Sequence, residues 1–169
     1  MQIRRLTPED AVAYRALRLR ALREHPEAFG SSYEEEQGKS ADWAARRLGN
    51  NEGFFLGAFS DAAALIGAVG LQLEQRHKLR HQGKVIGMYV APEFARRGVG
   101  RALIEALVSQ ARAIDHLESL RLTVTSAHAH VGKLYRSAGF VECGREPRAL
   151  KLDGRDYDKT LMFLDLRAE

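Results

Sequence analysis

Hydrophobic and polar positions along the chain follow regular spacings that predict a succession of helices and strands. Apolar residues at helical spacing predict a first helix over residues 7–25, with Tyr14, Leu17 and Ala21 on its buried face. A second helical repeat covers residues 98–114 and is the strongest in the chain. Its apolar positions are Leu103, Ile104, Leu107, Val108 and Ala111.

Apolar runs between these two helices are typical of strands. The runs 54–59, 65–74 and 85–90 are separated by polar stretches, so they predict an antiparallel meander of three strands. A short helix capped by Ser40 precedes them. Residues 29–36 have too few apolar positions for a core, and they predict a polar loop at the rim of a binding site.

The remaining elements are short and complete the pattern. They are a strand over residues 2–6, a strand over 120–125, a helix over 129–138 that ends at Gly139, and two strands around the turn Asp153-Gly154. The order predicts an α/β fold with one central mixed sheet, formed by a single domain over residues 1–169.

Composition is that of an ordinary globular protein. Of the 169 residues, 45% are hydrophobic and 28% charged, and no apolar run is long enough to cross a membrane. The N-terminus lacks the apolar stretch of a secretory signal, and Cys143 is the only cysteine, so no intrachain disulfide can form. We therefore expect a cytoplasmic protein without a membrane partner, with Cys143 as a small buried residue on a strand.

The chain is basic, with a net charge of +4 and an isoelectric point near 9.4. Its 26 basic residues are interleaved with 22 acidic ones, which disfavours a nucleic-acid partner. The densest basic cluster is the segment from Arg96 to Arg101, where a phosphorylated small molecule accounts for it equally well.

This segment has the pattern of a pyrophosphate site. An apolar strand passes through Pro92 into a basic turn with two glycines, and a helix follows. Gly98 and Gly100 lack side chains where the main chain must approach an anion, and the helix start supplies free N–H groups. Arg96, Arg97 and Arg101 add positive charge.

Two motifs resemble those of the GNAT superfamily of acetyl-CoA-dependent N-acetyltransferases. The first is Val90-x-Pro92 followed by Gly98-x-Gly100, and the second is Leu134-Tyr135 followed by Gly139-Phe140. The resemblance covers essentially the whole chain. It implies the GNAT fold, a mixed sheet of about seven strands with about four helices, and acetyl-CoA as cosubstrate without a metal. The chain departs from the family pattern at Ala95, His128 and Val131.

The resemblance also implies roles for individual residues. Main-chain N–H groups of the strand before the turn would hold the pantetheine arm and polarise the thioester carbonyl, and Tyr135 would be the catalytic acid that protonates the leaving thiolate. The residues expected to contact the coenzyme are Met88, Tyr89, Val90, Arg96, Arg97, Gly98, Val99, Gly100, Arg101, His128 and Tyr135.

The sequence leaves the general base open. Glu74 at a strand end, the run Glu34 to Glu36 and His128 are candidates, and a water relay is a further one. Each of these side chains also has an ordinary explanation as a surface charge or a loop hydrogen bonder.

The sequence therefore predicts an N-acetyltransferase that moves acetyl directly from acetyl-CoA to a primary amine of a small molecule or peptide. The acidic run at residues 34–36 hints at a cationic acceptor. Two alternatives remain: a catalytically weak CoA-binding sensor or regulatory module, and, less favoured, a basic nucleic-acid-binding domain. His77, His81, His128 and His130 have no cysteine or carboxylate at ligand spacing, which disfavours a metal. A homodimer through the closing strands rests on family analogy alone.

Overall fold

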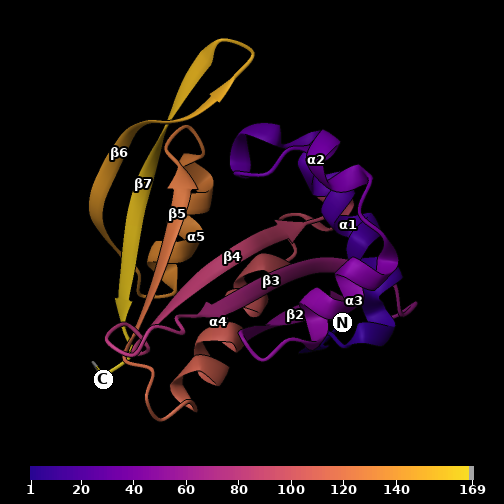
Figure 1. Cartoon of the computed structure of the whole chain (residues 1–169), viewed down its shortest axis with the longest axis horizontal. Coiled ribbons are helices and arrows are strands. Elements are labelled where there is room, and N and C mark those ends of the chain that lie inside the picture. Colours follow the sequence, from indigo (N-terminus) through magenta and orange to yellow (C-terminus); the bar gives the residue numbers. More distant parts are fainter. Residues whose placement is uncertain (168–169) are drawn as a thin grey trace.

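The computed structural model describes residues 1–167, apart from the side chain of Ala129. Its centre is a seven-stranded sheet in the order β1-β2-β3-β4-β5-β7-β6 (Figure 1). The strands are β1 (Gln2–Arg5), β2 (Gly53–Phe59), β3 (Leu65–Leu73), β4 (Gln82–Val90), β5 (Ser119–Thr125), β6 (Val141–Leu152) and β7 (Arg155–Asp165). The α-helices are α1 (Ala11–Glu24), α2 (Tyr33–Gln37), α3 (Ala41–Gly49), α4 (Val99–Arg112) and α5 (Ala129–Ser137). Short 3₁₀ helices are η1 (Pro8–Asp10), η2 (Pro26–Ala28) and η3 (Pro92–Phe94).

The pairing of the strands confirms a mixed sheet. Strands β1 to β4 are antiparallel neighbours, so the predicted three-strand meander is correct. β4 and β5 are parallel, and β7 lies antiparallel between β5 and β6. The closing turn is as predicted, with Asp153 (φ 47°) and Gly154 (φ 78°) both left-handed.

β4 and β5 are neighbours over only a short distance. Gln82 to Lys84 pair with Ser119 to Arg121, and beyond them the two strands diverge (Figure 1). On its other side β4 pairs with β3 through an irregularity, where the register shifts between Ala68 and Gly70. The outer half of β4 therefore has a sheet partner on one side only.

Helices cover the two faces of the sheet unequally. α4 packs against one face with Leu103, Ile104 and Leu107 fully buried in the larger core. α1 contributes Tyr14 and Leu17 to a second core on the opposite face, over β1 to β4, where α3 also packs. The predicted buried faces of these helices are confirmed.

Two expectations from the sequence are wrong. Residues 33–36 are not loop, because Ser32 caps α2 by accepting a hydrogen bond from Glu35 N, and Glu36 is buried. α2 is one of five α-helices among the described residues, in line with the mixed sheet and about four helices that the resemblance implied. Cys143 is exposed rather than buried, since β6 is the edge strand of the sheet.

No helix in the described part of the chain is long and apolar enough to span a membrane.

Candidate active site

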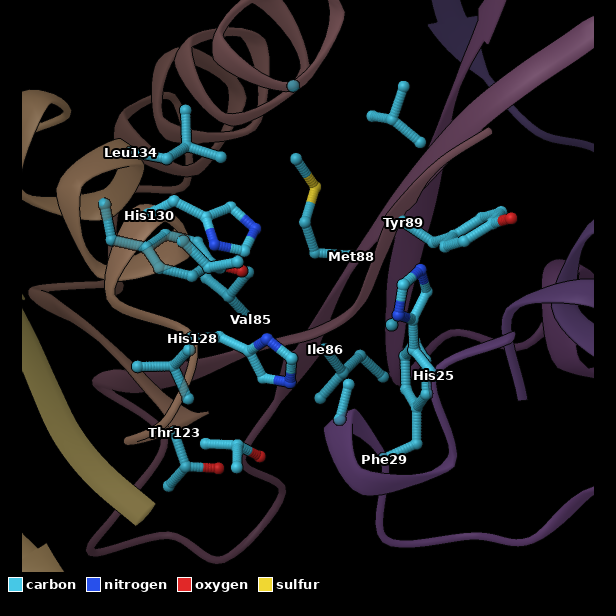
Figure 2. Close-up of a pocket in the computed structure, with 18 of the residues that line it drawn as sticks. His25, Phe29, Val85, Ile86, Met88, Tyr89, Thr123, His128, His130 and Leu134 are labelled. Atoms are coloured by element: carbon cyan, nitrogen blue, oxygen red, sulfur yellow. The ribbon is translucent and has the colours of Figure 1, made fainter. Parts of the chain in front are cut away.

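A cavity of about 790 Å³ lies where β4 and β5 separate. β4 from Lys84 to Val90 and β5 from Thr123 to Thr125 contribute to its walls, together with the start of α4. Figure 2 shows His128 and His130 on one side and His25 and Phe29 on the other, with Met88 between them. The size is that of a ligand site.

The start of α4 forms the basic end of this cavity. Gly98 has a left-handed conformation (φ 79°), as does Arg96 (φ 59°), so the chain turns sharply into the helix. The first main-chain hydrogen bond of the helix runs from Ala102 N to Gly98 O at 2.9 Å. The N–H groups of the first turn therefore have no partner inside the helix, which is the arrangement that binds phosphates.

The glycines and arginines of this turn differ in their surroundings. A Cβ built on Gly100 would lie 3.3 Å from Met88 Cε, so a larger residue would fill the space beside the helix start. Arg101 lines the cavity and donates to Glu105 at 2.7 Å. Arg97 does not line it; its guanidinium lies 5.6 Å from the centre of the Phe94 ring. The other ten residues expected to contact the coenzyme all line the cavity.

Tyr89 of β4 directs its side chain toward α1. Its hydroxyl donates a very short hydrogen bond to Glu24 Oε2. Burial and this carboxylate raise the pKa of Tyr89. The ring thus fastens β4 to α1, and any contact with the coenzyme at this position would come from the main chain.

Tyr135 of α5 is enclosed by apolar surroundings. The residue is 5% exposed, and its ring packs edge-on against Phe140 with the centroids 5.9 Å apart. Burial raises the pKa of Tyr135, so the phenol keeps its proton at neutral pH. No described residue hydrogen bonds to its hydroxyl, and the residue lines the cavity.

His128 stands at the opening between β5 and η2. Its Nε2 lies 2.9 Å from Glu27 Oε1, although the two atoms are not aligned for a hydrogen bond and this nitrogen is buried without another described partner. Thr125 Oγ1 donates to the main-chain oxygen of Glu27 at 2.7 Å. This bond holds η2 against the end of β5 and keeps Glu27 beside the imidazole.

A family model described as "Acetyltransferase (GNAT) family" matches residues 16–140, and this range contains every feature of the cavity described so far. The chain belongs to the GNAT acetyltransferase family. The resemblance found in the two motifs is thus confirmed, and the protein is an acyltransferase enzyme.

Solved structures of other GNAT proteins have the same fold. A GNAT acetyltransferase from Streptococcus pneumoniae is 25% identical, with a TM-score of 0.81 over 96% of this chain and 97% of that one. A phosphinothricin acetyltransferase from Sinorhizobium meliloti, solved with acetyl-CoA, is 21% identical, with a TM-score of 0.82 over 97% and 87%. A ribosomal-protein-alanine N-acetyltransferase from Brucella melitensis is 23% identical, with a TM-score of 0.78 over 98% and 99%. The search of curated proteins gave no match.

The acidic candidates for the base of this GNAT enzyme lie outside the cavity lining. Glu74 accepts hydrogen bonds from Arg76, Glu35 caps α2, and Glu36 is bound by Arg18. His128 is the one named candidate side chain that lines the cavity.

Several lining residues had no signal in the sequence. They are Arg18, His25, Arg47, Lys84 and Lys159, whereas Phe29, Gly30 and Ser31 belong to the segment expected at the rim of a binding site. The five come from α1 and the residue after it, α3, β4 and β7, and only the fold brings these elements together. In the described part of the chain no group of three His, Cys, Asp or Glu side chains is arranged to hold a metal ion.

Proposed function

We propose that this GNAT enzyme transfers the acetyl group of acetyl-CoA to a primary amine by direct attack on the thioester. One observation carries the proposal. A single cavity runs from the basic start of α4, along the unpaired edge of β4, to the buried phenol of Tyr135 and the imidazole of His128. We also propose that residues 1–169 act as one domain, and the exposed thiol of Cys143 suits the reducing cytoplasm.

The residues present suit the cosubstrate. The free N–H groups of the first turn of α4, with Arg96 and Arg101, would bind the diphosphate. The edge of β4 that lacks a β5 partner would bind the pantetheine arm through main-chain groups. Oriented N–H donors there would stabilise the oxyanion by about 3 kcal/mol each.

The chemical step needs two proton transfers. As the amine nitrogen forms its bond to the acetyl carbon, it loses a proton, which His128 would accept with Glu27 beside it. The carbon–sulfur bond breaks, and the leaving thiolate takes a proton from the Tyr135 hydroxyl. The products are an N-acetylated amine and CoA, and the two side chains then exchange their protons with water.

A base is required because of the acceptor's own chemistry. An alkyl amine with a pKa of about 10.4 is deprotonated to only a few parts in ten thousand at pH 7. The ammonium form must therefore lose one proton before the attack, and His128, which lines the cavity, would accept the other as the carbon–nitrogen bond forms.

The experiment is a thiol-release assay with acetyl-CoA and a panel of primary amines that includes peptides. We expect CoA release that depends on the amine and produces the acetylated amine in equal amount, as measured by mass spectrometry. Binding of acetyl-CoA without release in the presence of any amine would instead support a CoA-binding regulatory module.

A further inference from the structure

The charges around the cavity have one sign. Apart from tyrosine, every ionisable side chain that lines it is an arginine, a lysine or a histidine, and no described Asp or Glu is among the lining residues. A site for a polycation would need carboxylates at this surface, because unpaired like charges oppose binding.

The arginines and lysines of the lining, apart from Arg18, fall into two groups according to whether they lie at the start of α4. Arg96 and Arg101 belong to the start of α4, next to the end of β4 at Val90. Lys84 lies six residues before Val90, which is about 20 Å along a strand. The diphosphate of the coenzyme therefore accounts for the first group and leaves the second without a partner.

The second group consists of Arg47 from α3, Lys84 from β4 and Lys159 from β7. The guanidinium of Arg47 lies 5.4 Å from the ring centre of Trp43 and 5.2 Å from that of Phe55. Its Nε is buried and has no hydrogen-bond partner among the described residues. No described carboxylate forms an ion pair with any of these three residues.

The carboxylates nearest to the cavity bind other groups. Glu36 accepts two hydrogen bonds from Arg18, at 3.0 and 3.1 Å. Glu24 is held by Arg20 and Tyr89, and Glu27 lies beside His128. None of them neutralises the second basic group.

We infer that the acceptor amine carries an acid group, such as the carboxylate of an amino acid, and that Arg47 binds this group with support from Lys84 and Lys159. A planar guanidinium that lines the cavity and pairs with no described carboxylate is suited to bind one. The same positive charges disfavour an ammonium ion and so favour the neutral, reactive form of the amine. The inference rests on the proposed amine acetylation. It differs from the cationic acceptor that the acidic run at residues 34–36 suggested, because these residues do not line the cavity.

The test compares acceptors in matched pairs with the full-length enzyme. Each L-amino acid is assayed beside its carboxamide, which has the same amine and side chain but no acid group, and spermidine represents polycations. We expect kcat/KM for the best acid to exceed that for its amide by about tenfold or more, the value of one charge-assisted contact. Since the α-amine of an amide is the less basic of the two, intrinsic reactivity at neutral pH favours the amide and works against this result.

Variants locate the effect. Arg47→Gln should raise KM for the acid about tenfold, and so it should lower the ratio of kcat/KM for the acid to kcat/KM for its amide by a similar factor. Arg46→Gln is the matched control, because Arg46 is the adjacent exposed residue of α3 and does not line the cavity. Lys84→Gln should also raise KM for the acid. Because Lys84 is exposed, this second variant leaves the packing of Arg47 unchanged.

The outcomes separate the two proposals. A preference for acids that Arg47→Gln removes supports the inference. Turnover of amides or spermidine at least as efficient as that of acids overturns it and leaves amine acetylation in place. If no amine in the panel supports thiol release, both proposals are overturned.

Discussion

Tyr135 shows how a single residue acquires its chemistry from its neighbours. Tyr135 lines the cavity, and its burial among apolar side chains raises the pKa of its hydroxyl and keeps the phenol protonated. The motif around Leu134 and Gly139 was enough to single it out. Arg47 was not predictable, because its position beside Phe55 and the cavity depends on the packing of α3 against β2.

The substitution Tyr135→Phe tests the role of this hydroxyl. We expect kcat to fall about tenfold or more, since the thiolate loses its proton donor, while acetyl-CoA affinity and melting temperature stay near wild type. Steady-state kinetics and thermal unfolding check this. Tyr157→Phe, outside the cavity lining, is the control, and wild-type turnover in Tyr135→Phe would remove the assigned role.

At the scale of elements, α2 and the turn before α4 differ in how much the sequence reveals. The turn carries its own signal, because its glycines and arginines act through local backbone geometry. α2 has the sequence Tyr-Glu-Glu-Glu-Gln. This sequence has no apolar face, so its pattern predicts a loop. Its one buried side chain, Glu36, is 4% exposed and pairs with Arg18, which is 12% exposed. A partner 18 residues away cannot be inferred from a local pattern.

We expect Glu36→Gln to weaken the docking of α2 on α1. The free energy of unfolding should fall by about 3 kcal/mol at pH 7, because Arg18 loses its buried counterion. Burial alone would raise the pKa of Glu36, but the hydrogen bond and charge of Arg18 lower it below its usual 4.5. The carboxylate is therefore stabilising above pH 4.5 and loses this contribution as the pH falls through its lowered pKa.

Urea unfolding at pH 7 and in acid measures this difference. The gap between wild type and Glu36→Gln should narrow as the pH falls below 4.5. Glu34→Gln, two residues earlier in α2 and exposed, is the control and should change stability by about 0.5 kcal/mol or less. A gap that stays constant down to low pH would show that charge is not what Glu36 contributes.

At the scale of the whole molecule, the early separation of β4 from β5 creates the site. Three residue pairs join these strands, and the cavity occupies the gap beyond them. The sequence predicted the meander, the long helix and the closing strands, because each has a local period. It could not show that β5 lies beside β4, or that β7 brings Lys159 to the cavity, since strand order is set by packing over the entire sheet.

The central claim is that the start of α4 holds the diphosphate of acetyl-CoA. Isothermal titration calorimetry with acetyl-CoA, and with S-acetylpantetheine, which lacks the nucleotide and its diphosphate, tests it most directly. We predict binding of one acetyl-CoA per chain, and an affinity for S-acetylpantetheine weaker by about a hundredfold, the value of two charge-assisted contacts. No uptake of acetyl-CoA, or equal affinity for the two ligands, would contradict the account.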